Sequence, residues 1–218
     1  MEVGGIWGNF YWLCLWIMRM AYLNILWGLF TLLGLIVIGF TPATVAMFRV
    51  IRKWLKKETE IPIFETFWST YKEEFLKSNI FTIIIVTIGL ILLVDLSFLG
   101  SITEHPIYPL LLSGLFLCGF IYLVLILYIF PLYVNYNLSR WLYIKYAILI
   151  GLTNLHYTIT MMIVISGLYY LFMRIPGLIP FFSISTTGLV IMGISYLSFK
   201  NLDKKRSMEN QQAKNSTT

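Results

Sequence analysis

Asp95 is the one acidic residue inside a long apolar run of this chain, and this position makes it the first candidate for chemistry. Ionisable groups within a bilayer are costly, and they often mark the path of an ion or a substrate. At 1.5 Å per helical residue, Asp95 lies roughly 22 Å from the start of its run, close to the far end. Two interpretations stay open: an ion pair with Arg19 or Arg174, or a role with a substrate or ion.

Three further polar residues, Asn24, Asn154 and His156, also lie inside apolar runs. Threonines surround His156, and a histidine with hydroxyl neighbours is more often satisfied by interhelical hydrogen bonds than used in catalysis. A proton relay or a ligand contact is the alternative for His156. We expect Asn24 and Asn154 to join helices through hydrogen bonds.

No motif in the chain indicates an enzyme. An HExxH zinc motif and a glycine-rich phosphate loop are both absent from the sequence. Glu73 and Glu74 begin a pattern found in some membrane proteases, but that pattern needs arginine where Ser78 stands. Cys14 and Cys118 lie in apolar runs, so neither a disulfide framework nor a zinc-ligand spacing is available. We therefore expect no catalytic residue, no metal and no cofactor.

The elements that carry these residues belong in a membrane. Hydrophobic residues make up 59% of the 218 residues and charged residues only 12%, whereas soluble domains are about one quarter charged. The net charge of +6 does not indicate nucleic acid, because the basic residues flank apolar runs and form no basic domain of their own. The first 18 residues contain Glu2 and no Lys or Arg, which is unlike a signal peptide.

Five stretches are apolar enough to cross a bilayer, which takes about 20 helical residues. We expect an all-α polytopic bundle, one membrane domain over residues 1–200, with spans at residues 21–40, 80–99, 110–132, 146–172 and 178–199. Residues 5–20 are either an interfacial helix or an extension of the first span, and their Trp and Tyr content favours the interface. The polar residues 201–218 have too little apolar surface to fold, which predicts a disordered tail.

Loop charges predict the orientation. With the N-terminus outside, segments 41–79, 133–145 and 200–218 face the cytoplasm and hold seven, two and five of the sixteen Lys and Arg residues. Arg19 and Arg174 are then the basic residues outside. The positive-inside rule therefore favours an N-out, C-in bundle.

Segment 41–79 is expected to form an amphipathic helical hairpin on the cytoplasmic side. Threonine is favoured at the N-cap of a helix and proline at its first position, so Thr41 and Pro42 predict a helix start. The following apolar and basic residues fall on opposite helix faces, so the helix should lie on the membrane with its basic face toward anionic headgroups. After a break at Pro62, aromatic residues recur with helical spacing. A membrane anchor and a protein-docking surface both stay open for this hairpin, and the residues concerned are Arg49, Arg52, Lys53, Lys56, Lys57, Phe67, Trp68 and Tyr71.

The run GLIVIGFTPATVAMFRVIRKWLKKETEIPIFETFWSTYKEEFLKSN closely resembles the signature of the YesL-like family of bacterial membrane proteins. The segments LNILW (23–27), YIFPLY (128–133) and NYNLSRWLYIKYAILIGLTNL (135–155) fit the same family. The chain departs from the family pattern at Thr41 and near Lys57, where glycine is expected, and at Ser69, where a basic residue is expected. The resemblance implies a multi-pass plasma-membrane protein of a Gram-positive bacterium, of undefined activity, associated with ABC importers and plant polysaccharide breakdown.

Two functions stay open. The first is a non-catalytic accessory protein that binds the permease subunits of a carbohydrate ABC importer through the cytoplasmic hairpin and its lipid-facing helices. The alternative is a small permease, acting alone or as a homo-oligomer, with Asp95 and His156 near its path. Transporters usually show internal repeats and broken helices at the midplane, and the sequence contains no repeat.

Overall fold

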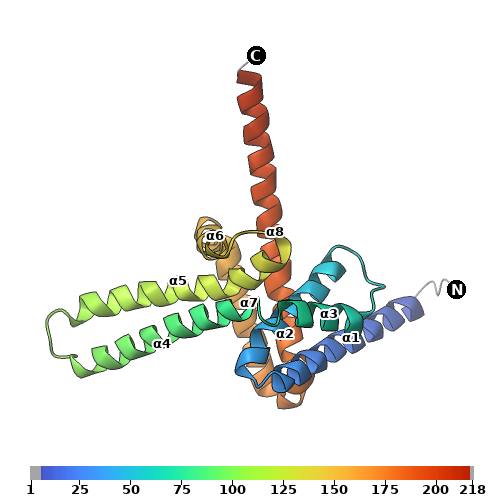
Figure 1. The fold of residues 1–218 in the computed structure, drawn as a ribbon, viewed down its shortest axis with the longest axis horizontal. Coiled ribbons are helices and arrows are strands. Elements are labelled where there is room, and N and C mark those ends of the chain that lie inside the picture. Colours follow the sequence, from blue (N-terminus) through green and yellow to red (C-terminus); the bar gives the residue numbers. More distant parts are fainter. Residues whose placement is uncertain (1–5, 217–218) are drawn as a thin grey trace. The chain divides into compact units, whose positions relative to one another are not determined.

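The computed structural model describes the backbone of residues 6–216 and the side chains of residues 10–201. Within these residues the chain is helical, with no strand (Figure 1). Its elements are α1 (Ile6–Leu33), α2 (Val37–Leu55), α3 (Ile63–Glu74), α4 (Asn79–Ser101), α5 (Tyr108–Asn135), α6 (Arg140–Thr153), α7 (Leu155–Arg174), the 3₁₀ turn η1 (Pro176–Leu178) and α8 (Ile179–Ser216).

Five segments of the described chain are helical, long and apolar enough to cross a membrane, which confirms the predicted polytopic all-α class. They are Phe10–Leu33, Asn79–Ser101, Tyr108–Asn135, Leu155–Arg174 and Pro176–Asn201. Three boundaries differ from the prediction by seven residues or more. The first segment begins at Phe10 instead of residue 21. The first segment ends at a turn after Leu33, and the fourth begins after a break at Asn154, where φ is −115° and ψ is 51°.

The aromatic N-terminal stretch is not a separate interfacial helix. It is the first part of α1, which runs without interruption from Ile6 to Leu33. The physical reason is that no proline interrupts these residues and their only glycines, Gly8 and Gly28, are isolated. Residue 5 lies outside the described residues.

Helix α2 corrects the predicted surface helix. It begins at Val37, so Pro42 lies inside the helix and Thr41 is not its N-cap. The stretch from Thr41 to Phe48 is buried throughout. Its apolar face is covered by protein and not by lipid: Met47 and Ile51 both reach Gly188 of α8.

Contacts divide the chain into two units. Unit 1 comprises residues up to Ile84 together with Val164–Val190, and unit 2 comprises Ile85–Ile163 together with the residues from Ile191 onward. Helices α4, α7 and α8 each continue from one unit into the other. The single membrane domain over residues 1–200 therefore stays a prediction.

The polar tail differs from the expected disordered segment. Helix α8 continues through it to Ser216, and residues 217–218 lie outside the described residues. Half of residues 201–216 are Lys, Arg, Gln, Glu or Ala, which have high helix propensity. Because it extends a helix that already exists, it needs no costly nucleation step.

Candidate functional site

The aromatic face of α3 is directed into unit 1. Phe67 is fully buried and Tyr71 is buried, and Phe30 of α1 lies 5.3 Å and 5.0 Å from their rings. The sequence analysis included Phe67 and Tyr71 in a possible docking surface. In the structure, both rings pack against α1 and hold α3 on it. Trp68 is 38% exposed, and the ammonium of Lys72 lies 4.8 Å from its ring centre.

A hydrogen bond fixes the same contact. The Tyr71 hydroxyl donates to the backbone carbonyl of Phe30 at 3.0 Å. Burial raises the pKa of this phenol, so the hydroxyl keeps the proton that it donates. Hydrogen bonding and ring packing together make α1, α2 and α3 one packed cluster within unit 1.

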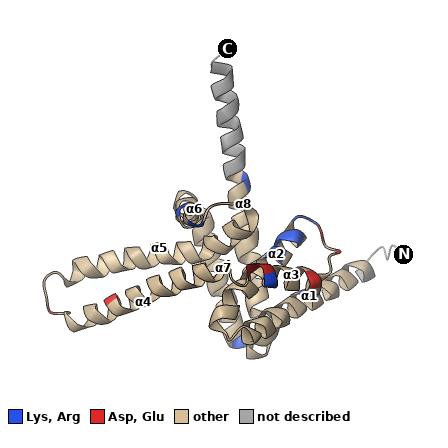
Figure 2. Cartoon of the chain, in the orientation of Figure 1, with Lys and Arg blue, Asp and Glu red and all other residues tan. Residues whose placement is uncertain are grey.

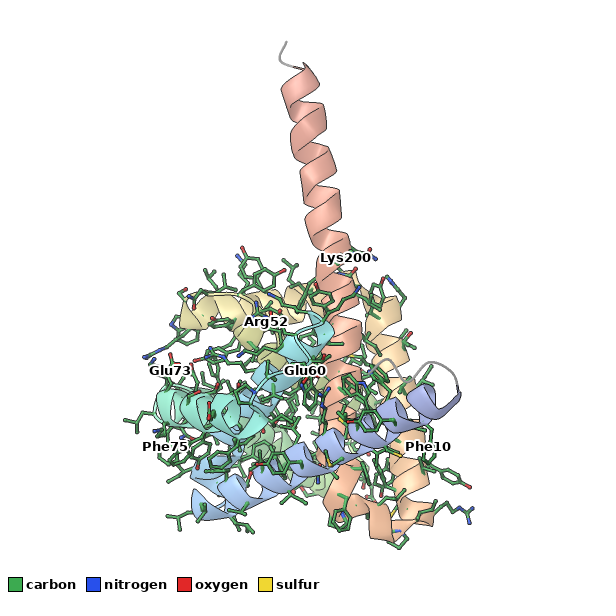
Figure 3. The ribbon with its side chains drawn as sticks, turned by 90° about the vertical axis from the view of Figure 1, so that its right-hand side faces the viewer. Phe10, Arg52, Glu60, Glu73, Phe75 and Lys200 are labelled. Carbon is green, nitrogen blue, oxygen red and sulfur yellow. The ribbon has the colours of Figure 1, made fainter. Side chains whose placement is uncertain are left out.

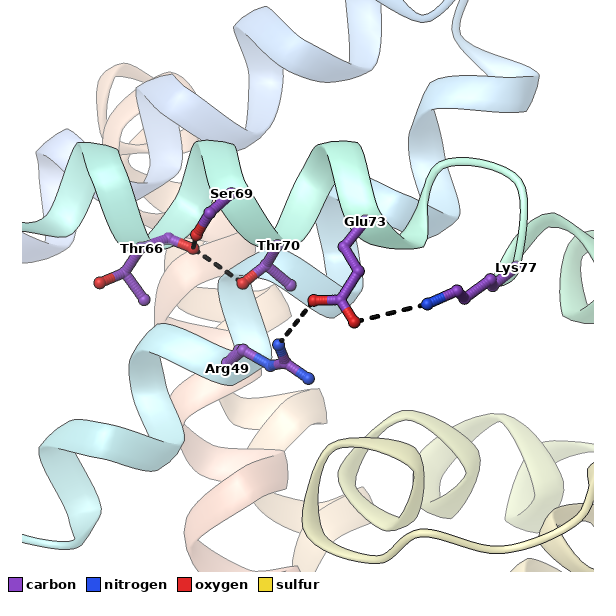
Figure 4. A network of polar contacts seen from close by, with 6 residues as sticks. All are labelled: Arg49, Thr66, Ser69, Thr70, Glu73 and Lys77. Carbon is purple, nitrogen blue, oxygen red and sulfur yellow. Dashed lines mark hydrogen bonds and ion pairs between the residues drawn. The ribbon is translucent and has the colours of Figure 1, made fainter.

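Charged residues of unit 1 gather on α2, α3 and the loop between them (Figure 2). Glu73 of α3 joins Arg49 of α2 at 3.5 Å and Lys77 at 3.4 Å. Figure 4 shows this network beside the carbonyl of Thr66, which accepts hydrogen bonds from the side chains of Ser69 and Thr70. The ion pairs are partly exposed, so each contributes at most about 1 kcal/mol to stability.

Helix α2 ends in a basic cluster, which we call the basic end of α2 and define as Arg52, Lys53, Lys56 and Lys57. Its backbone closes in a Schellman motif: Lys57 has φ of 69°, its N–H donates to Trp54, and the N–H of Glu58 donates to Lys53. Among the described side chains, Lys53, Lys56 and Lys57 form no ion pair. Lys53 on the packed helix, and Lys56 and Lys57 in the turn that closes it, therefore present positive charge without an ion-pair partner among the described side chains.

Arg19 of α1 lies beside this region. Its guanidinium donates to the Glu60 carboxylate at 3.1 Å, and it is only 12% exposed. Figure 3 shows Arg52 and Glu60 at the same end of α2. The predicted orientation places Arg19 and segment 41–79 on opposite sides of the membrane, whereas the structure pairs Arg19 with Glu60 of that segment.

The four intramembrane candidates have different surroundings. Asn24 joins two helices: its amide N–H donates to the carbonyl of Pro180 at 2.8 Å, and its oxygen accepts the N–H groups of Ile184 and Ser185 at 3.0 and 2.9 Å. Asn154 does not join helices, because its amide bonds the carbonyl of Ile150 and the hydroxyl of Thr153 in its own segment.

His156 and Asp95 are both exposed. The ring of His156 contacts Tyr157, with 4.1 Å between centroids. Asp95 lines a hollow of about 390 Å³ between α4 and α5. Of its expected partners, Arg19 is paired with Glu60 and Arg174 donates to Tyr170 at 2.7 Å.

A buried hydrogen-bond network in unit 2 was not predicted from the sequence. Tyr128 and Thr158 are fully buried; the Tyr128 hydroxyl lies 3.1 Å from that of Thr158, which donates to the carbonyl of Gly151 at 2.8 Å. Gly151 allows this approach, since an added Cβ would lie 2.2 Å from Val124. The sequence feature that could have indicated this network is a glycine together with several polar residues inside one apolar run.

The described side chains provide no metal centre: no group of three or more His, Cys, Asp or Glu residues among them could hold an ion.

Three relatives from Bacillus subtilis (strain 168) cover nearly the whole chain. YteU is 39% identical over 90% of this chain and 87% of its own length, YesV is 38% identical over 86% and 89%, and YesL is 32% identical over 90% and 92%. All three are described as uncharacterized proteins, and no solved structure matches the chain. The family "Protein of unknown function, DUF624" matches residues 20–96, which run from α1 through the basic end of α2 into α4. The chain therefore belongs to the DUF624 family, together with these YesL-like proteins.

Proposed function

We propose that this chain is a non-catalytic accessory protein of the bacterial plasma membrane that binds a partner protein through the basic end of α2. The supporting observation is that Lys53, Lys56 and Lys57 have no ion pair among the described side chains, while Lys53 lies on the packed helix α2 and the other two lie in the Schellman turn that closes it. A charged group held on a rigid element loses little conformational freedom on binding, so its charge is available for recognition.

The partner chemistry follows from the charge. Lysines near a membrane surface attract acidic protein loops as well as anionic lipid headgroups. The YesL-like resemblance supports one partner to test first, the permease subunits of a carbohydrate ABC importer. The aromatic residues Phe67 and Tyr71 are left out of the proposed surface, because α1 covers them.

The test is co-purification of the tagged protein from its native membrane in mild detergent, with mass spectrometry of the bound proteins. The variant is Lys53→Glu with Lys56→Glu. Its matched control is Arg140→Glu with Lys145→Glu on α6, where both side chains are exposed and the change in charge is the same. We expect importer subunits with the wild type and the control, and at least a tenfold loss with the variant.

Two outcomes count against the proposal. The first is equal recovery of partners with the variant and the wild type, and the second is the absence of any membrane-protein partner from the wild type. Equal loss in the variant and the control would show that net charge, not the basic end of α2, governs the association.

A small permease is the second candidate, and one observation favours it. Asp95 lines a hollow together with the apolar residues of α4 and α5, and a carboxylate within a span suggests an ion or substrate path. A homo-oligomer would be needed to enclose a pore there. Purified protein in liposomes should then pass a solute, and Asp95→Asn or His156→Ala should block that flux.

A further inference from the structure

Helices α1 and α2 form an antiparallel hairpin whose two ends differ sharply in polarity. Trp16 contacts Trp54 near the open end, with ring centroids 5.5 Å apart, and Trp27 donates to the Thr44 hydroxyl at 3.1 Å nearer the turn. Figure 1 shows the turn at one end of the pair and the α2–α3 loop at the other. The position of a residue along the hairpin is therefore well defined.

The turn of the hairpin is apolar and exposed. We call it the apolar tip and define it as Leu32, Leu33, Leu35, Ile36 and Val37, whose exposed fractions are 67, 68, 78, 59 and 62%. Turns that face water are normally built from Gly, Asn, Asp, Ser and Pro. Five of the six residues 32–37 are exposed aliphatic residues, the sixth being Gly34, which indicates a hydrocarbon environment for this turn.

The backbone of the tip is tightly fixed despite these residue types. Leu35 and Ile36 have φ of 60° and 61°, a left-handed conformation that side chains, and above all β-branched ones, disfavour. An added Cβ at Gly34 or Gly39 would lie 2.3 or 2.6 Å from backbone atoms, so the chain turns at the closest possible approach. Aliphatic side chains occupy positions that suit glycine or asparagine better, which points to a requirement for apolar surface.

The open end of the hairpin is charged. It contains the Arg19–Glu60 ion pair and the basic end of α2, with Glu58 between them. Residues joined at 3.1 Å lie on one side of a membrane. Although α1 is long and apolar enough to span by itself, its residue 19 is held to the segment that follows α2.

We propose that α1 and α2 are a re-entrant membrane hairpin: the apolar tip is embedded in the lipid hydrocarbon, and both arms return to the side that carries the basic end of α2. Helix α1 then makes no crossing of its own, and the start of α1 lies on the same side as residues 56–62. The Trp and Tyr residues around positions 11–16 fall at the interface that they favour.

The charge distribution supports this arrangement. Moving Arg19 to the side of segment 41–79 brings fifteen of the sixteen Lys and Arg residues to one side and leaves Arg174 on the other. The positive-inside rule is satisfied better than with α1 as a full crossing. The complete crossings are then those of α4, α5, α7 and α8.

The test is cysteine labelling with a membrane-impermeant maleimide, in intact cells and in inverted vesicles. Cys14→Ala with Cys118→Ala gives a background without thiols, into which single cysteines are introduced: Met18→Cys beside the open end, Glu58→Cys after α2, Leu35→Cys in the apolar tip, and Glu104→Cys in the α4–α5 loop. The side chains of Met18 and Glu58 are exposed and make none of the contacts described above, so these variants keep the Arg19–Glu60 pair.

Positions 18 and 58 should label from the same side, opposite to position 104. Position 35 should label at least tenfold more slowly than position 58 from either side, and fully after solubilisation in SDS. Purified Leu35→Cys and Leu33→Cys in liposomes should stay protected, which separates lipid from a covering partner protein. Labelling of position 18 together with 104 would overturn the proposal, and so would rapid labelling of position 35 from either side or in liposomes.

Discussion

Asn24 is the residue that ties α1 to α8 most directly within unit 1. Its side chain takes the place of part of the helical hydrogen-bond ladder, because the carbonyl of Pro180 and the N–H of Ile184 are normal partners in an α-helix and both bond Asn24. A side chain inserted into the ladder is a known cause of helix distortion. The start of α8 is therefore shaped by a residue on another helix.

Replacement of Asn24 by leucine, Asn24→Leu, should destabilise the protein by about 2 kcal/mol, because three interhelical bonds worth roughly 0.6 kcal/mol each are lost. The measurement is thermal unfolding in detergent micelles. Asn154→Leu is the matched control, since Asn154 bonds only its own segment, and its effect should be smaller. An unchanged stability for Asn24→Leu would mean that the α8 ladder closes again between Pro180 and Ile184.

The type of residue at these positions was predictable, but its partner was not. An asparagine in an apolar run must satisfy its amide, so bonding of some kind was expected for Asn24 and Asn154 alike. One reaches α8 about 160 residues further along the chain, and the other bonds a carbonyl four residues away. That difference depends on which helix lies nearby, and local sequence does not encode it.

Helices α4 and α5 meet at a glycine notch within unit 2. The Tyr122 hydroxyl donates to the carbonyl of Ile85 at 2.9 Å, and a Cβ added at Gly89 would lie 2.7 Å from that hydroxyl and 3.4 Å from the ring carbon that bears it. The absence of a side chain at Gly89 is what lets the tyrosine reach the backbone. Small residues at helix contacts in membranes serve the same purpose.

This notch predicts a coupling between two substitutions. Gly89→Ala alone should destabilise the protein, because the methyl group displaces the Tyr122 hydroxyl from Ile85. In a Tyr122→Phe background the same change should be neutral or stabilising, since the clash is gone and alanine favours helix over glycine by about 1 kcal/mol. Thermal unfolding of the four proteins gives a coupling energy of roughly 0.5–3 kcal/mol. Gly114→Ala, where nothing lies near the added Cβ, controls for helix propensity, and additive effects would contradict the prediction.

Composition predicted the spanning elements well and the helical hairpin less well. Runs such as α4 and α5 are apolar on every face, so length and hydropathy suffice to identify them. Helix α2 has an amphipathic sequence, and amphipathicity does not distinguish lipid from a protein neighbour as the cover for its apolar face. Leu35 and Ile36 are not turn-forming residue types, so Gly34 was the only sequence signal for the break after Leu33, and an isolated glycine is tolerated inside a helix.

At the scale of the whole molecule, the distribution of charge predicts the side of each loop. Segments 41–79, 133–145 and 200–218 hold nearly all the Lys and Arg residues, while the loop between α4 and α5 holds none. The positive-inside rule therefore predicts the same orientation for these segments whether α1 crosses or returns. Re-entry of α1 changes only the side of the residues at the start of the chain, Arg19 included.

Reporter fusions test this orientation independently of the hairpin. Alkaline phosphatase joined after Thr103 should be active, because the short α4–α5 loop faces outward, and joined after Asn201 it should be at least tenfold less active. Green fluorescent protein at the same two positions should give the opposite pattern. The N-terminus then separates the two arrangements of α1: a fluorescent protein fused before residue 1 should fluoresce if the hairpin returns, and should be dark if α1 crosses. Phosphatase activity after Asn201 would show that the whole bundle has the opposite orientation. The basic end of α2 would then lie outside, contrary to the positive-inside rule.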